Sequence, residues 1–149
     1  MRALTPLALA LLLAFPATAG EPTLLLRSPS VSADHVAFVY AGDVWVADRD
    51  GAHPRRLTVH PGVESDPFLS PDGALVAFTG HYDGNADVYV VPVDGGQPDR
   101  LTFHPTDDAA RGWTPDGESV LLRSGRLTQS RRDRRIYTVP VGGGMPAPM

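Results

Sequence analysis

The sequence predicts an all-β protein, made of about three four-stranded antiparallel blades of an incomplete β-propeller that follow a signal peptide. Three observations support this fold class. A repeat of 44 residues fills the chain after residue 20, each repeat holds two short apolar runs bounded by turn residues, and no helical periodicity follows residue 20. Four-stranded sheets that recur at about this spacing and pack between like neighbours are typical of β-propellers.

Several independent anchors share the 44-residue offset, which makes the repeat secure. One anchor, Val88-Tyr89, returns as Ile136-Tyr137 after 48 residues, so the third repeat carries about four extra residues within Ser124–Arg135. The anchors at the common offset are Leu57-Thr58 with Leu101-Thr102, Asp43-Val44 with Asp87-Val88, Asp50-Gly51 with Asp94-Gly95, and Pro71-Asp72-Gly73 with Pro115-Asp116-Gly117.

The apolar runs within each repeat are expected to be β-strands. They contain β-branched and aromatic residues and are apolar at successive positions, which indicates strands covered on both faces. Pro-Asp-Gly sets the turn before the first run, because proline fixes φ, aspartate bonds nearby backbone and glycine accepts positive φ. The expected strands are Val36–Tyr40 and Val44–Ala47 in the first repeat, Ala74–Thr79 and Val88–Val91 in the second, and Ser119–Arg123 and Ile136–Val139 in the third.

The composition narrows the classes of function. Apolar residues make up 42% of the chain and charged residues 20%, which indicates a packed core. Fifteen glycines and fifteen prolines in 149 residues indicate many tight turns. A formal net charge of −4 gives no reason to expect a nucleic-acid partner. The absence of cysteine excludes a disulfide scaffold, a thiolate zinc site and a cysteine nucleophile.

Residues 1–19 have the pattern of a signal peptide. Arg2 gives a short positive segment, Leu7–Phe15 is an unbroken apolar run, and Ala17-Thr18-Ala19 fits the small-x-small cleavage rule. The alternative is a buried N-terminal helix, but the run is too short to cross a bilayer, so no membrane span is predicted. We expect cleavage after Ala19 and an exported, periplasmic protein.

Residues 20–149 are then a partial β-propeller, with blades at approximately 22–62, 63–106 and 107–149. Propellers use about four to eight blades, so three repeats leave the ring open. The chain is therefore expected to be the N-terminal fragment of a longer protein. Symmetric assembly of three-blade chains is the alternative.

The repeats resemble those of TolB and of the tricorn proteases. The general pattern is Ser70-Pro-Asp-Gly, Val76-Ala-Phe78, Asp87-Val-Tyr-Val90 and Arg100-Leu-Thr102. Three more specific stretches look like the N-terminal six-bladed propeller of tricorn-like proteases: Gly62-Val-Glu-Ser-Asp-Pro67, Phe78-Thr-Gly-His-Tyr-Asp-Gly-Asn85 and Gly112-Trp-Thr-Pro-Asp-Gly117. The resemblance covers Leu24 to the C-terminus.

The resemblance implies a non-catalytic segment of an exported serine peptidase. In that family the propellers are thought to pass peptides or unfolded polypeptide to a peptidase core, which this chain lacks, and the full-length parent is expected to be a homo-oligomer. One alternative is a TolB-like periplasmic propeller that binds partner proteins without enzymatic activity. Another is a propeller fused to an unrelated hydrolase.

No catalytic residue, metal site or cofactor is predicted within the chain. His60 and His104 share one repeat position, which places them on separate blades rather than beside a nucleophile, while His35 falls in a turn and His81 next to a hairpin tip. Asp83-Gly-Asn85-Ala-Asp87 has the spacing that opens a calcium loop, but its sixth position, Val88, lies within an expected strand. A hairpin turn is the preferred interpretation.

Arginine residues are the candidates for binding peptide carboxylates. Residues 123–135 carry six arginines and one aspartate, and would attract anionic partners. The tricorn resemblance implies an arginine pair in the loop before a Pro-Asp-Gly turn, where the matching segment Thr106–Gly112 offers only Arg111. The candidate substrate-binding residues are Arg111, Arg131 and Arg132. A solvated loop is the alternative for the arginine-rich segment.

One aromatic position recurs in all three repeats, at Trp45, Tyr89 and Tyr137. These rings could line a ligand-binding face, but a repeated aromatic residue in a strand usually packs between blades. Inter-blade packing is the preferred interpretation.

N-terminal sequencing tests the predicted leader. Material exported by a host with a signal peptidase should begin at Gly20, because the small-x-small rule places the cut after Ala19. Recovery of Met1 from the exported protein would contradict this prediction.

Overall fold

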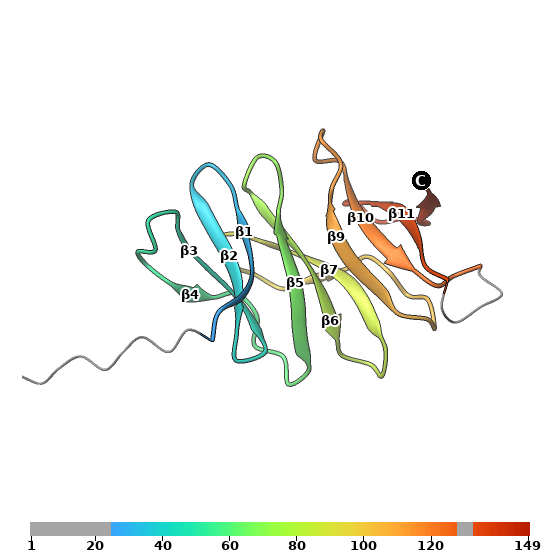
Figure 1. Ribbon diagram of the computed structural model, residues 1–149, viewed down its shortest axis with the longest axis horizontal. Helices are drawn as coiled ribbons and strands as arrows, with labels where there is room; N and C mark the ends of the chain where they lie inside the picture. The colour runs from blue at the N-terminus through green and yellow to red at the C-terminus, as the bar shows by residue number, and fades with distance from the viewer. Residues whose placement is uncertain (1–24, 128–132) are drawn as a thin grey trace, which may run out of the picture.

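The computed structural model describes residues 25–127 and 133–149 and shows an all-β fold (Figure 1). Three four-stranded antiparallel sheets lie side by side in chain order. The first holds β1 (Arg27–Val31), β2 (His35–Tyr40), β3 (Asp43–Asp48) and β4 (Arg55–Arg56). The second holds β5 (Val63–Leu69), β6 (Leu75–His81), β7 (Ala86–Pro92) and β8 (Asp99–Arg100). The third holds β9 (Asp108–Trp113), β10 (Ser119–Ser124), β11 (Arg135–Pro140) and β12 (Ala147–Pro148).

The predicted fold class is confirmed. Each sheet has its strands in sequence order, with every neighbouring pair antiparallel, as a propeller blade requires. The six expected strands correspond to β2, β3, β6, β7, β10 and β11. The predicted leader, residues 1–19, lies outside the described residues, as do Arg131 and Arg132. No helix of the described residues is long and apolar enough to span a bilayer.

The sheets converge at their first strands. Strand β5 contacts both β1 and β9, whereas the main contacts of the two-residue strands β4, β8 and β12 are with the preceding strand of their own sheet. We call the surface formed by β1, β5 and β9 the inner wall. The sequence did not mark these three strands, because they are only partly buried and carry Pro29, Pro67 or Gly112.

Pro-Asp-Gly forms the turn before β6 and again before β10. The Asp72 carboxylate accepts hydrogen bonds from the Ser70 hydroxyl at 2.6 Å and the Ala74 amide at 3.1 Å. Asp116 accepts from Thr114 and Glu118 at 2.6 and 3.0 Å in the same way. These hydroxyl bonds lower the pKa of both carboxyls. Gly73 and Gly117 each have φ of +74°, so glycine is required where the turn was predicted.

The core lies between the sheets rather than within any one of them. One apolar cluster joins the first and second sheets and another joins the second and third. The second sheet is therefore covered on both faces: every residue of β7 except Pro92 is buried, and Phe78 on β6 is fully buried. This confirms the expectation from the apolar runs.

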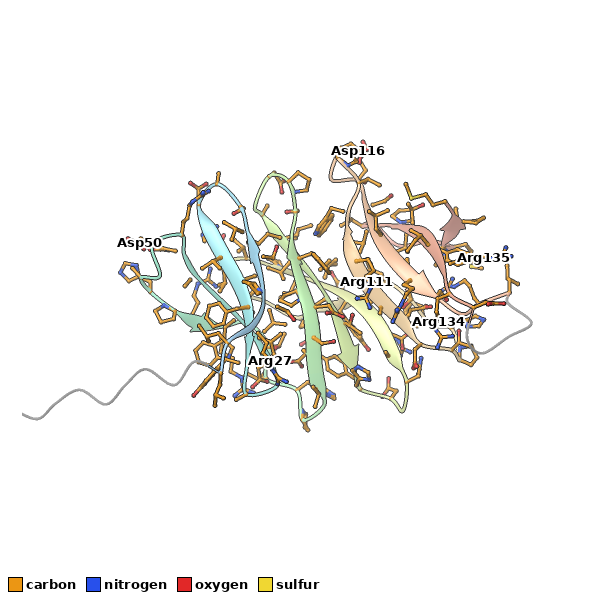
Figure 2. All side chains as sticks on the ribbon, in the orientation of Figure 1. Arg27, Asp50, Arg111, Asp116, Arg134 and Arg135 are labelled. Atoms are coloured by element: carbon orange, nitrogen blue, oxygen red, sulfur yellow. The ribbon has the colours of Figure 1, made fainter. Side chains whose placement is uncertain are left out.

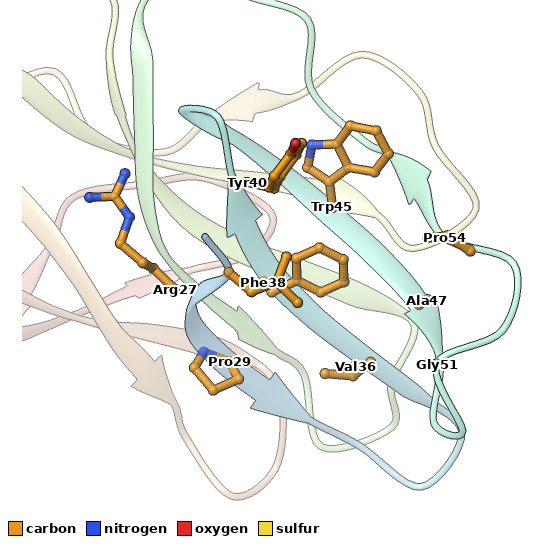
Figure 3. Close-up of a pocket in the computed structure, with 10 residues that line it drawn as sticks. Arg27, Pro29, Val36, Phe38, Tyr40, Trp45, Ala47, Gly51 and Pro54 are labelled. Carbon is orange, nitrogen blue, oxygen red and sulfur yellow. The ribbon is translucent and has the colours of Figure 1, made fainter. Parts of the chain in front are cut away.

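The repeated aromatic position packs between blades where a neighbouring blade exists. Tyr89 is 6% exposed and belongs to the cluster between the first two sheets, while Tyr137 is 2% exposed and belongs to the other. Trp45 instead borders an apolar recess of about 620 Å³ on the uncovered face of the first sheet, beside Phe38 and Tyr40 (Figure 3). Its indole Nε1 is buried and has no hydrogen-bond partner among the described residues. Among the described residues no second sheet packs on this face, whose aromatic and apolar side chains resemble those of a contact between blades.

Candidate functional site

The candidate site lies on the inner wall, where each first strand carries a β-bulge. The pairing register shifts between Arg27 and Ser30 on β1, between Ser65 and Phe68 on β5, and opposite Leu121/Leu122 on β9. Asp66, in the β5 bulge, has φ of +51°. A bulge turns side chains away from the regular alternation of a strand, and bulges are frequent next to functional sites.

The β5 and β9 bulges bring Arg111 and Asp66 together. Arg111 lies on β9, between the second and third sheets (Figure 2). Its Nη1 atom donates to Asp66 Oδ2 at 2.8 Å and to the Ala110 carbonyl at 2.6 Å. Both side chains are about one-third exposed, at 32% and 34%. Arg111 was expected in a loop, and this is wrong: pairing with β10 draws the segment into a strand.

This arrangement leaves part of the Arg111 guanidinium available. Neither Nε nor Nη2 has a hydrogen-bond partner among the residues that the structure describes. These two atoms form the side of the guanidinium that binds a carboxylate through two parallel hydrogen bonds. Asp66 therefore orients the arginine through one nitrogen, while the fork remains open to an anion.

Each of the strands β5 and β9 carries one buried acidic residue, and the two acids occupy equivalent positions in the repeat. Glu64 is 1% exposed and accepts hydrogen bonds from the Thr58 hydroxyl and the Tyr82 hydroxyl, both at 2.7 Å. Asp108 is fully buried and is paired with Arg126. In each of these two blades, one hydrogen-bond donor follows the acid by 18 residues: Tyr82 for Glu64 and Arg126 for Asp108. Asp108 Oδ1 has no partner among the described residues.

Burial raises the pKa of the Glu64 carboxyl above its ordinary value, although the hydrogen bonds from Thr58 and Tyr82 oppose the shift. Burial and the neighbouring Glu64 raise the pKa of the Tyr82 phenol, so it stays a hydrogen-bond donor. Thr58 also accepts the Val44 amide at 2.9 Å. Through its bond with Thr58, Glu64 thus connects the segment that follows β4 of the first blade to β5 of the second blade.

An arginine occupies the place where calcium was considered. Arg100 donates to Asp83 at 3.0 Å and to Asp87 at 2.6 Å, and its positive charge therefore lies between the two carboxylates. Burial raises the pKa of Asp87, and Arg100 counteracts this. The Asn85 side-chain amide donates to the His104 carbonyl at 2.9 Å and so links the β6–β7 hairpin to the segment between β8 and β9. Among the residues that the structure describes, no cluster of three or more histidine or acidic side chains is arranged for a metal.

The histidine rings lie in separate local contacts. His53 pairs with Asp48 at 2.7 Å on the surface, and this bond raises the pKa of its imidazole. His60 accepts the Gly62 amide, and His104 bonds Thr106 within the same loop. Each of these three rings is thus held by a neighbour within a few residues of it in the sequence.

Comparison with known proteins decides the family. The family model of the tricorn protease N-terminal beta propeller domain matches residues 23–149, which is nearly all of the chain beyond the predicted leader. The chain belongs to this family.

Two curated relatives of this propeller come from Streptomyces coelicolor (strain ATCC BAA-471 / A3(2) / M145). Putative tricorn protease homolog 2 is 42% identical over 55 residues, covering 36% of this chain and 5% of its own length. Tricorn protease homolog 1 is 39% identical over 59 residues, covering 40% and 6%. The matched stretches thus span about one-twentieth of these relatives.

Solved structures agree on the fold. The crystal structure of the tricorn protease has a TM-score of 0.72 at 22% identity, covering 84% of this chain and 13% of that one. TolB from Acinetobacter baumannii has a TM-score of 0.69 at 25% identity, covering 83% and 31%. The three sheets therefore correspond to propeller blades in both kinds of protein.

The buried carboxyl predicts a pH-dependent stability. A carboxyl whose pKa is raised in the folded state contributes most below its unfolded pKa of about 4.3, and its contribution is lost as the pH rises through the folded pKa. The free energy of unfolding of the wild type, minus that of Glu64→Gln, should therefore increase from pH 7 to pH 4.5. Urea denaturation at both values measures it.

The control is Glu118→Gln, which makes the same change at an exposed turn residue. Its difference from the wild type should stay constant over this range. A Glu64→Gln difference that shrinks on acidification would contradict the assignment of Glu64 as a carboxyl held in a desolvating site.

Proposed function

We propose that this propeller segment is non-catalytic and acts in the passage of peptide substrates or products to a serine-peptidase core outside this chain. The observation that carries the proposal is the open fork of Arg111 on the inner wall, oriented by Asp66. Membership of the tricorn propeller family and the tricorn homologues supply the link to proteolysis. The proposed partners are peptides or unfolded polypeptide.

A peptide C-terminus is the group that suits Arg111. Its carboxylate is planar and accepts two parallel hydrogen bonds, which matches the Nε and Nη2 pair. The partial exposure of Arg111 admits a ligand while keeping the charge less screened than on an open surface. Arg131 and Arg132 lie outside the described residues, and their part in binding peptide carboxylates stays a prediction from the sequence.

Export belongs to this proposal. The sequence pattern of residues 1–19 supports a periplasmic location, where peptides from degraded proteins would be the substrates. A homo-oligomeric full-length parent is part of the same hypothesis.

A TolB-like propeller that binds proteins without taking part in proteolysis is the second candidate. It is favoured by the structural match to TolB from Acinetobacter baumannii, whose TM-score is close to that of the tricorn protease. The two functions differ in what the inner wall recognises, since a protein scaffold needs no free carboxylate.

Arg111→Ala should weaken binding of a peptide with a free C-terminus about ten- to hundredfold, because a charge-assisted bond to a carboxylate contributes about 1.5–3 kcal/mol. Binding of the amidated peptide should not change. Isothermal titration of acetylated hexa-alanine, free or amidated, measures both. Arg56→Ala is the matched control, since Arg56 pairs with Asp43 away from the inner wall.

Equal affinity of the free and amidated peptides for the wild type would contradict peptide capture by Arg111. That outcome would favour the TolB-like alternative.

A further inference from the structure

A second recess lies between the first and second sheets, away from the inner wall. Its volume is about 310 Å³, at the lower end of the range for ligand sites. The chain leaving β4 forms one side and the turn between β7 and β8 forms the other, with Tyr82 and Tyr89 between them. None of the residues that line it belongs to β1, β5 or β9. The recess is therefore distinct from the site of Arg111.

The Tyr89 hydroxyl is the unpaired polar group of this recess. Tyr89 is 6% exposed, yet its hydroxyl has no hydrogen-bond partner among the described residues. The hydroxyl is not among the fully enclosed, unpaired polar atoms, and Tyr89 is one of the residues that line the recess. A nearly buried phenol usually finds a partner within the protein. Here a ligand atom can supply it.

The repeat provides an internal comparison. A recess of about 150 Å³ lies at the equivalent place between the second and third sheets. There the equivalent phenol, Tyr137, donates to the Arg126 carbonyl at 3.0 Å, and Arg126 and Met145 stand where Tyr82 and Gln97 stand in the larger recess. The recess between the second and third sheets thus has about half the volume, and its tyrosine hydroxyl is paired. The recess between the first and second sheets is larger, and its tyrosine hydroxyl has no partner among the described residues.

Three polar side chains around the larger recess can donate a hydrogen bond. His60 Nδ1 accepts the Gly62 amide at 2.9 Å, so the neutral ring carries its hydrogen on Nε2. Gln97 contributes a side-chain amide, and Tyr89 contributes its hydroxyl. Much of the remaining lining is apolar: two prolines, Leu57 and Val59 lie beside a group of rings, in which the His60 and Tyr82 centroids are 3.7 Å apart and the Tyr82 and Tyr89 centroids are 4.6 Å apart.

These features match one class of ligand. A polyproline II segment presents unpaired carbonyls and few N–H groups, and its rings pack into aromatic-lined grooves with little loss of entropy. Residues 64–118 carry eleven acids and two arginines, a net charge of −9, which disfavours acidic flanks. We propose that the recess between the first and second blades binds a proline-containing peptide segment, and that a main-chain carbonyl of this peptide accepts a hydrogen bond from the Tyr89 hydroxyl.

Titration of the full chain with acetylated, amidated hexaproline, followed by saturation-transfer NMR, tests the proposal. Tyr89→Phe should weaken binding about five- to tenfold, because it deletes one hydrogen bond and preserves the ring. Val59→Arg should abolish binding, since Val59 is 79% exposed at the mouth and an arginine there would fill it.

The chain offers a matched control for each variant. Tyr137→Phe makes the same deletion at the paired hydroxyl, and Phe103→Arg makes the same insertion at the smaller recess; both should bind hexaproline as the wild type does. Acetylated, amidated hexaglycine, which lacks the rings, should not bind.

Three results would overturn the proposal. These are no binding of hexaproline at millimolar concentration, equal effects of Tyr89→Phe and Tyr137→Phe, or loss of hexaproline binding in Arg111→Ala, which would move the ligand to the inner wall. Because hexaproline here carries no free carboxylate, failure at this recess is distinguishable from failure of the proposed role of Arg111.

Discussion

Burial of one sheet between two others is the constraint on which the rest of this structure depends. Each blade has two apolar faces and cannot bury either alone, so the apolar runs become stable strands only when neighbours cover them. The second sheet shows the result, with Phe78, Val88 and Val91 fully enclosed. Tyr89 and Tyr137 pack against the preceding blade, whereas Trp45, at the same repeat position, borders an uncovered face.

Polar contacts also connect neighbouring blades, and they differ between the two interfaces. Thr58 and Thr102 each accept the amide of the third strand in their own blade. The acid of the following blade is held by neutral hydroxyls at Glu64 but by an arginine at Asp108. Because Tyr82 takes the place of Arg126, the first interface keeps a wide, aromatic recess and the second is narrow. The Arg111–Asp66 pair forms between the bulges of β5 and β9, and a bulge recurs in the first strand of every blade.

The sequence predicted the strands that carry apolar runs and missed the first strands, although both kinds recur in every blade. The 44-residue offset, the Pro-Asp-Gly turns and the apolar runs were enough for the blades and their middle strands. The first strands were missed because bulges, prolines and partial burial remove the strand pattern from β1, β5 and β9. Arg111 was selected from its place in the family pattern, but Asp66 lies 45 residues away and only the packing of two blades brings it near. The recurring 18-residue spacing of Glu64 with Tyr82, and of Asp108 with Arg126, could have pointed to the buried acids.

Amide hydrogen exchange of the full chain, followed residue by residue, tests the central claim most directly. If neighbour coverage is what stabilises a blade, the amides of β6 and β7 should exchange most slowly, with those of β2, β3, β10 and β11 less protected because, within residues 25–127 and 133–149, their sheets have a neighbouring sheet on one face only. Equal protection of the three sheets, or greater protection of the first, would show that each blade is stable by itself and would contradict the account.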